Sequence, residues 1–521
     1  MNNLASPGMV LAVWISLFAY IGLIVFFVVR GARRTKNISD YAVGNMNFSP
    51  VVLGFSLAAS MSSAATFIIN PGFVAYYGLS AFLSMGVFLP IGTLISLAVL
   101  SKRFRKIGHT IQAKTLGQWI GIRYNSKGFT TYFAFLSLLM IAFIVLICVG
   151  LTQVLSRSLN LEILPTLSCI VIFTFGYMMF GGANSMVYTN MMQACLKLGV
   201  AIILLTSGYE HFANGVHGLL EKLSAISPNL SSPFNTESPL YRDFWEVCIA
   251  QFIVGVAIVC QPHILTRSLF LKNDKDVKKF LTVTIIVQAI FFLVVFTGIY
   301  ARLFYPDLMA NGKKIPLDGV MSTFVVGRFP VYIAVIIVLG MISAGMSTLE
   351  GLIQSISTTI TSDMIKPLSG NRFIKNENEG IISELLMNKI VIGILAIVAI
   401  TISYQQLVSP DLSVGIFAQN GVYAFFSAAF IPVVFGIFLK EVPKVVPIAA
   451  SVTALVVHFS VYYGRLTHYM QSGTRNPGIA SALAIVSSVC MGSVLYFLLR
   501  KKPVVINKVL LRKKNIIVNE A

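Results

Sequence analysis

Ala344, Ser347 and Thr348 stand at positions i, i+3 and i+4 of an apolar segment. In a helix this spacing places all three residues on one face, where two hydroxyl groups and a backbone carbonyl point the same way. Oxygens of this kind suit a hard cation such as sodium, and an unwound helix opposite could supply the remaining ligands. The alternative is that both hydroxyls only bond to carbonyls of the preceding turn.

Two ionisable side chains, Lys197 and Glu350, lie well inside apolar segments. An unpaired charge in the bilayer interior costs several kcal/mol, so each needs a partner or water. Lys197 follows Asn190 by seven residues, or about two helical turns, and its side chain leans back toward Asn190. Glu350 follows Ser347 by three residues. We therefore expect a buried ion pair between Lys197 and Glu350 beside Asn190, with either a functional or a purely structural role.

Two apolar segments break their own helical pattern. The first is rich in small residues and is interrupted at Asn70-Pro71-Gly72, and the second is interrupted at Gln261-Pro262. The two breaks lie five segments apart, and because five is odd, a second copy must cross the membrane in the opposite direction. Paired broken helices in inverted halves are typical of transporters with a site at the membrane midplane. Ordinary proline kinks are the alternative.

These residues are carried by apolar segments long enough to cross a bilayer, which takes about 20 residues. The chain has 521 residues, of which 56% are hydrophobic and 11% charged, and its mean hydropathy of +0.82 excludes a soluble globular protein. Thirteen spans are expected, at residues 9–29, 48–78, 80–101, 129–154, 161–181, 185–206, 244–270, 280–304, 329–364, 389–409, 411–438, 445–463 and 477–499.

The net charge of +20 follows membrane topology rather than nucleic-acid binding. If the end of the first span is placed inside, 29 of the 39 Lys and Arg residues fall on the inner side and nine on the outer side, with Lys197 within a span. Such a bias predicts an amino terminus outside and a carboxyl terminus inside, and hence an odd number of spans. We expect a multi-pass protein of the cytoplasmic membrane that contacts the lipid bilayer and no nucleic acid. The oligomeric state stays open.

Several short motifs, in their order along the chain, resemble those of the sodium/solute symporter family, which includes proline, pantothenate and sodium/galactose transporters. The motifs that carry the resemblance are Asn70-Pro71-Gly72, residues 115–124, Gln261-Pro262-His263 with Arg267, Ala344-x-x-Ser347-Thr348 with Asp363, and residues 428–434. The resemblance implies an all-α polytopic membrane protein with a LeuT-type five-plus-five inverted repeat. It divides the chain into an extra first helix and inner loop (1–47), two five-helix repeats (48–206 and 244–438), two additional helices (445–499) and a basic cytoplasmic tail (500–521).

The resemblance also implies a site between the first broken span and the ninth span. The expected sodium ligands are the carbonyls of Ala59, Ser62 and Ala344 and the hydroxyls of Ser347 and Thr348. The solute would lie beside them, against Thr66, Gln261 and Gln419, with Asn420 and His263 as neighbours.

Two positions depart from the family. Met61 stands where proline permeases have an aspartate, and Asn190 stands where the family has the aspartate of a second sodium site. Both changes remove a carboxylate, which argues against proline as the solute and against a second sodium ion. We expect the Lys197 ammonium to replace that second sodium, with Glu350 as its counter-ion, which would leave one sodium per solute.

The resemblance implies a secondary active transporter that takes up a small polar, carboxylate-bearing solute with sodium as coupling ion, by alternating access and with no cofactor. Exposed helix N-termini at a break favour an anion, and the expected solute residues include no acid. A proton-coupled or facilitative transporter of the same fold is the alternative. An ion channel would need a ring of like groups along an open path. An enzyme would need an acid pair, metal ligands or an activated nucleophile, and Glu350 is a lone acid, so no enzymatic activity is expected.

Overall fold

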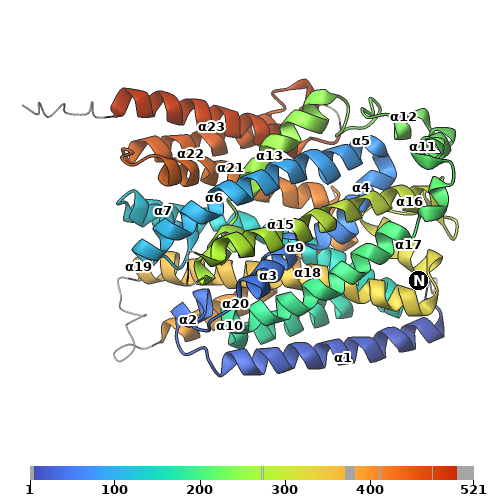
Figure 1. Ribbon diagram of the computed structural model, residues 1–521, viewed down its shortest axis with the longest axis horizontal. Helices are drawn as coiled ribbons and strands as arrows, with labels where there is room; N and C mark the ends of the chain where they lie inside the picture. The colour runs from blue at the N-terminus through green and yellow to red at the C-terminus, as the bar shows by residue number, and fades with distance from the viewer. Residues whose placement is uncertain are drawn as a thin grey trace, which may run out of the picture.

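A computed structural model of the chain describes residues 5–271, 273, 275–369, 382–409, 412–471 and 473–500. Apart from Arg500, the expected basic tail at 500–521 lies outside these residues. The described chain folds into helices and one hairpin, in which β1 (Met309–Ala310) pairs antiparallel with β2 (Lys313–Lys314). The long helices lie roughly along a common axis (Figure 1).

The helices up to the middle of the chain contain the first broken span, which consists of α3, η1 and α4 and bends by 55°. In chain order the elements are α1 (Pro7–Ala32), α2 (Ile38–Val43), α3 (Pro50–Met61), the π-helix η1 (Ala65–Ile69), α4 (Asn70–Tyr77), α5 (Leu79–Phe82), η2 (Leu83–Phe88), α6 (Leu89–Ile111), α7 (Leu116–Arg123), α8 (Lys127–Leu136), η3 (Ser137–Met140), α9 (Ile141–Leu159) and α10 (Ile163–Thr206).

The connection after α10 contains η4 (Tyr209–Phe212), α11 (Gly215–Ile226) and α12 (Pro228–Ser231). The second broken span follows and bends by 58°. It consists of η5 (Trp245–Ala250), α13 (Gln251–Ile258), α14 (Pro262–Leu265) and η6 (Thr266–Phe270). The remaining elements are α15 (Asp276–Leu293), η7 (Val294–Phe296), α16 (Thr297–Phe304), η8 (Leu317–Gly319), α17 (Val320–Arg328), α18 (Val331–Thr359), η9 (Ile360–Ile365), α19 (Lys366–Leu368), α20 (Glu384–Val408), α21 (Val414–Phe438), α22 (Val445–Gly464), η10 (His468–Met470) and α23 (Pro477–Leu499).

Ten helices of the described chain are long and apolar enough to cross a membrane, and the two bent pairs raise this number to 12. One of the ten, α10, has 44 residues, which would extend about 66 Å as a straight helix, roughly twice the thickness of a membrane core. It is interrupted at Gly182, where φ is 57° and ψ is −157°. A Cβ at this position would approach the Tyr41 ring to 2.6 Å, so the site requires glycine. Dividing α10 at Gly182 gives 13 crossing segments, in agreement with the expected spans.

The position expected for the first break is wrong. Asn70 and Pro71 begin α4, which continues directly from η1, and the bend lies instead between Met61 and Ala65. Pro71 lies within the continuous stretch Ala65–Tyr77, directly after the π-helical turn η1, and this wider turn accommodates the missing proline N–H without ending the helix. Ser62 leaves helical geometry with φ −93° and ψ 99°. The second break does lie at Gln261-Pro262, between α13 and α14.

The first broken span lies inside the molecule rather than at its edge. In Figure 1, α1 runs along one side and α22 and α23 along the opposite side, with α3, α9, α15 and α18 between them. The start of α1 and the end of α23 lie at opposite ends of the helices, as an odd number of crossings requires (Figure 1). The assignment of 48–206 and 244–438 to two inverted repeats stays a prediction.

Candidate cation and solute site

The bend after α3 exposes backbone carbonyls at the centre of the molecule. The last carbonyls of a helix have no intrahelical donor, and that of Ala59 belongs to this group, while that of Ser62, the C-cap residue, lies just beyond the helix end. Both residues have no exposed surface. Polar donors from neighbouring helices must therefore satisfy these oxygens.

The ammonium group of Lys197, from the second half of α10, satisfies them. Its Nζ atom lies 2.7 Å from the carbonyl oxygen of Ala59 and 2.9 Å from that of Ser62. It also lies 2.7 Å from the Ser62 hydroxyl and 3.2 Å from the Ser347 hydroxyl. Lys197 thus contacts three of the five oxygens that the sequence predicted as sodium ligands.

The other expected sodium ligands join α3 directly to α18. The Ser347 hydroxyl donates to the Ala59 carbonyl (2.8 Å) and lies 3.2 Å from the Ala344 carbonyl. The Thr348 hydroxyl donates to the carbonyl of Ser60 (2.8 Å). The structure therefore brings the five residues together on the facing surfaces of α3 and α18, with the Lys197 ammonium among them.

The expected ion pair between Lys197 and Glu350 is not formed. The Glu350 carboxylate accepts hydrogen bonds from Tyr177 (2.6 Å), Thr189 (2.6 Å) and the amide of Gln193 (3.1 Å). All three donors belong to α10, on both sides of Gly182. The two charges have separate partners because Glu350 faces this cluster of donors, whereas Lys197 extends to the uncapped end of α3. Its ammonium accordingly lies at the expected main sodium site and not at a second one.

Asn190 lies between Glu350 and a second buried cation, Arg267 of η6. With its amide oriented to match its neighbours, the Asn190 nitrogen donates to Glu350 (3.2 Å) and its oxygen accepts from Arg267 (2.9 Å). Arg267 also donates to the hydroxyls of Ser56 (3.1 Å) and Ser60 (3.3 Å) on α3. Arg267 is part of a sequence motif but was not among the expected site residues. An arginine inside an apolar segment was the signal that could have identified it.

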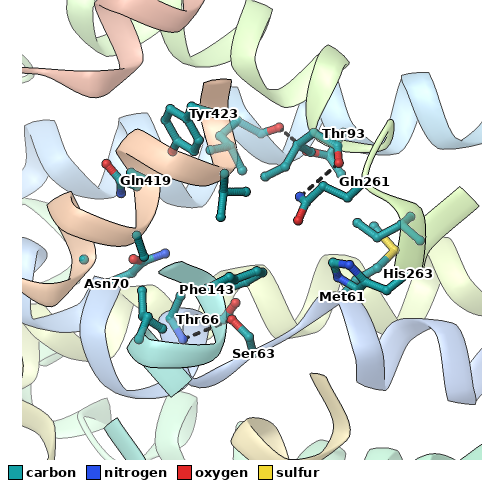
Figure 2. A pocket seen from close by; sticks show the side chains of 18 of the residues that line it. Met61, Ser63, Thr66, Asn70, Thr93, Phe143, Gln261, His263, Gln419 and Tyr423 are labelled. Carbon is teal, nitrogen blue, oxygen red and sulfur yellow. Dashed lines mark hydrogen bonds between the residues drawn. The ribbon is translucent and has the colours of Figure 1, made fainter. Parts of the chain in front are cut away.

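A cavity of about 100 Å³ lies next to this cluster, between the two broken spans and α21 (Figure 2). Four of the expected solute residues line it, namely Thr66, Gln261, His263 and Gln419. Figure 2 shows them around a common space, together with the polar residues Ser63, Asn70, Thr93 and Tyr423, which were not expected. Met61, the position of the missing aspartate, also lines the cavity.

Two polar atoms at this cavity have no hydrogen-bond partner among the described residues. They are the amide oxygen of Gln261 and Nδ1 of His263, and both side chains are at least 98% buried. Buried polar atoms are seldom left without a partner, so these two are available to a bound molecule. Asn420 does not share the cavity, because it turns toward α22 and donates to the Tyr463 hydroxyl (2.9 Å).

The sequence of this chain matches a family model and several known proteins. The family model described as "Sodium:solute symporter family" matches residues 41–445. The chain is 26% identical over 356 residues to the sodium/pantothenate symporter of Haemophilus influenzae, covering 67% of this chain and 71% of that protein. It is 25% identical over 412 residues to a sodium/sialic acid symporter of Aliivibrio fischeri, covering 74% and 76%.

Among solved structures, the chain is similar to a Na⁺-coupled sialic acid symporter in a substrate-bound, outward-open state. The TM-score is 0.72 at 17% sequence identity, and the match covers 94% of this chain and 98% of that one. At this identity the likeness shows a shared fold. It confirms the fold class that the sequence predicted.

Proposed function

This chain belongs to the sodium:solute symporter family, and on this basis we propose that it takes up a small polar, carboxylate-bearing solute by alternating access. It is a multi-pass membrane transporter and not an enzyme. The observation that carries the proposal of a polar solute is the cavity between the two broken spans, where the Gln261 amide oxygen and Nδ1 of His263 have no partner among the described residues. A site between paired broken helices can open to either side as the halves move.

The charge around the cavity favours an anionic solute. No acidic residue is among the side chains that line it in the described part of the chain. The charged residues buried nearby are Lys197, Arg267 and Glu350, two cations and one carboxylate. Thr66 and Gln419 carry hydrogen-bond donors that a carboxylate can accept. The names of the relatives support this solute class, since pantothenate and sialic acid are both carboxylates.

Two sources of driving force are compatible with this uptake. Sodium is the first, and it is supported by the family and by the relatives named as sodium symporters. The second is a proton gradient, or a solute gradient alone. One observation favours it, namely that the Lys197 ammonium lies on the oxygens expected to bind sodium.

Uptake by purified protein in proteoliposomes tests the solute class, with pantothenate and its neutral alcohol, pantothenol, as a matched pair. We expect saturable uptake of the carboxylate and little of the alcohol. Gln419→Leu should raise KM about tenfold or more, the usual effect of losing a hydrogen bond to a charged group. Asn420→Leu, on the face toward α22, is the control and should change KM little.

Equal uptake of the acid and the alcohol would refute the carboxylate preference. Repeating the assay with inward sodium or choline gradients at fixed pH distinguishes the two driving forces. Sodium coupling predicts accumulation only with sodium, whereas the second candidate predicts equal rates with both cations.

A further inference from the structure

We propose that the ε-ammonium group of Lys197 takes the place of the sodium ion between α3 and α18, so that this site binds no sodium while the lysine occupies it. The proposal rests on the proposed function only in taking the family's cation site as its reference. It concerns the cation and not the solute, and its test requires no solute.

The atoms around Nζ of Lys197 match the surroundings of a bound cation. Two of its four neighbours are backbone carbonyl oxygens, of Ala59 and Ser62, which can only accept hydrogen bonds. The Ser62 hydroxyl donates its hydrogen to the carbonyl of Ala58 (2.8 Å), and the Ser347 hydroxyl donates to Ala59 (2.8 Å). Both hydroxyls therefore present lone pairs to Nζ. An ammonium has three donors and no lone pair, so it is the form of lysine that this environment binds.

The same contacts hold α3 and α18 together, as a bound cation would. A sodium ion at this point would connect the uncapped end of α3 to α18. Lys197 makes this connection from α10, with Nζ within 3.2 Å of oxygens on both helices. A direct hydrogen bond also joins the two helices, because the Thr348 hydroxyl of α18 donates to the carbonyl of Ser60 on α3.

The surroundings of Lys197 oppose a second cation beside the first. Phe291 of α15 and Phe67 of η1 present their rings to Nζ, with ring centroids 5.1 and 6.0 Å away. These rings stabilise a cation but supply no anionic charge. The buried carboxylate nearby, Glu350, already accepts three hydrogen bonds from α10. The amide of Asn190 also bridges it to Arg267. A sodium ion would add uncompensated positive charge to a buried region.

Sodium binding to the purified, full-length protein tests this assignment. We expect the wild type to show no saturable ²²Na⁺ binding that Ser347→Ala removes, and no rise of the melting temperature in sodium chloride over choline chloride of the same ionic strength that Ser347→Ala removes. Lys197→Ala removes the ammonium but leaves the carbonyls of Ala59 and Ser62 and the Ser347 hydroxyl in place. This variant should gain saturable sodium binding and a melting temperature that rises with sodium concentration, because a ligand of the folded state stabilises it.

Two further variants define the site. Lys197→Ala combined with Ser347→Ala should bind sodium at least tenfold more weakly than Lys197→Ala alone, since one ligand is lost. Lys222→Ala, at an exposed lysine of α11, should behave as the wild type.

Saturable sodium binding by the wild type that Ser347→Ala abolishes would overturn the proposal. So would a monodisperse Lys197→Ala protein that binds no sodium. If Lys197→Ala does not fold in choline but folds in sodium, the proposal is supported, because sodium then restores the lost connection. If it folds in neither salt, the wild-type measurement decides. Because no solute takes part, failure of the carboxylate proposal would leave all these outcomes unchanged.

Discussion

Glu350 shows how a buried charge can be retained without a direct salt bridge. Its carboxylate has no exposed surface and accepts hydrogen bonds from two hydroxyls and an amide. Arg267 is equally buried and reaches Glu350 through the amide of Asn190. Hydrogen bonds to a charged group are roughly twice as strong as neutral ones, and they compensate part of the desolvation of both ions.

We expect Glu350→Gln to be strongly destabilising, because it leaves Arg267 as a buried cation without a nearby carboxylate. Removing one member of a buried pair costs about 3–5 kcal/mol. Thr189→Val, which removes a single hydrogen bond to the carboxylate, should cost about 1.5–3 kcal/mol. The apparent melting temperature in detergent measures both effects.

The double variant Glu350→Gln with Arg267→Met tests the coupling between the two charges. It should be more stable than the sum of the single losses predicts, since neither charge is then left alone. Strictly additive losses would show that Asn190 does not couple Arg267 to Glu350.

At the scale of elements, the loop before α17 is attached to the start of α21. The carboxylate of Asp318 in η8 accepts hydrogen bonds from the Ser413 hydroxyl (2.7 Å) and from the backbone N–H of Val414 (3.0 Å). Close to it, the carbonyl of Leu317 would lie only 2.2 Å from a Cβ at position 72, so Gly72 allows α4 to pack against this loop. The loop thus connects the first broken span to α21, which lines the cavity.

Burial raises the pKa of Asp318 above its ordinary value, although the bonds from Ser413 and Val414 act in the opposite direction. A raised pKa means that the folded protein binds this proton more tightly than the unfolded chain. The resulting stabilisation is complete below the unfolded pKa of about 3.9 and is lost as the pH rises through the folded pKa. We therefore expect the melting temperature of the wild type, relative to Asp318→Asn, to increase as the pH falls from about 7 to about 4. A difference that does not change with pH would contradict this assignment.

At the scale of the whole molecule, connections cluster at two opposite ends of the helices. The loop with α11 and α12 lies at the same end as the amino terminus, and α2 and α7 lie at the other end (Figure 1). Basic residues are more frequent in the connections at the end with α2 and α7, which predicts that this end faces the cytoplasm.

Two lysine-to-cysteine variants test this orientation. They are Lys222→Cys on α11 and Lys440→Cys between α21 and α22, both exposed positions. A membrane-impermeant maleimide added to intact cells should label the first and should label the second only after permeabilisation. The three exposed native cysteines, Cys169, Cys195 and Cys490, are replaced by alanine beforehand. The reverse labelling pattern would show that the topology is inverted.

Much of this architecture could be predicted from the sequence, because each segment that crosses a bilayer must by itself be long enough and apolar enough to do so. Length and hydropathy determined the spans, charge predicted their orientation, and Pro262 marked the second break. The spacing of Ala344, Ser347 and Thr348 correctly predicted one shared face on α18. The position of the first break could not be predicted in the same way, because the π-helical turn before Pro71 keeps the helix continuous there.

The tertiary structure alone decided which groups meet across helices. Lys197 could reach either toward Glu350 or toward the end of α3, and helical spacing places it on a face without naming its partner. The packing of α10 against both α3 and α18 brings uncapped carbonyls within hydrogen-bond distance of its ammonium, while donors from α10 itself surround Glu350. Likewise, adjacent residues point about 100° apart on a helix, so Gln419 faces the cavity and Asn420 faces α22. A one-dimensional pattern specifies the face of a helix, but only packing specifies what that face meets.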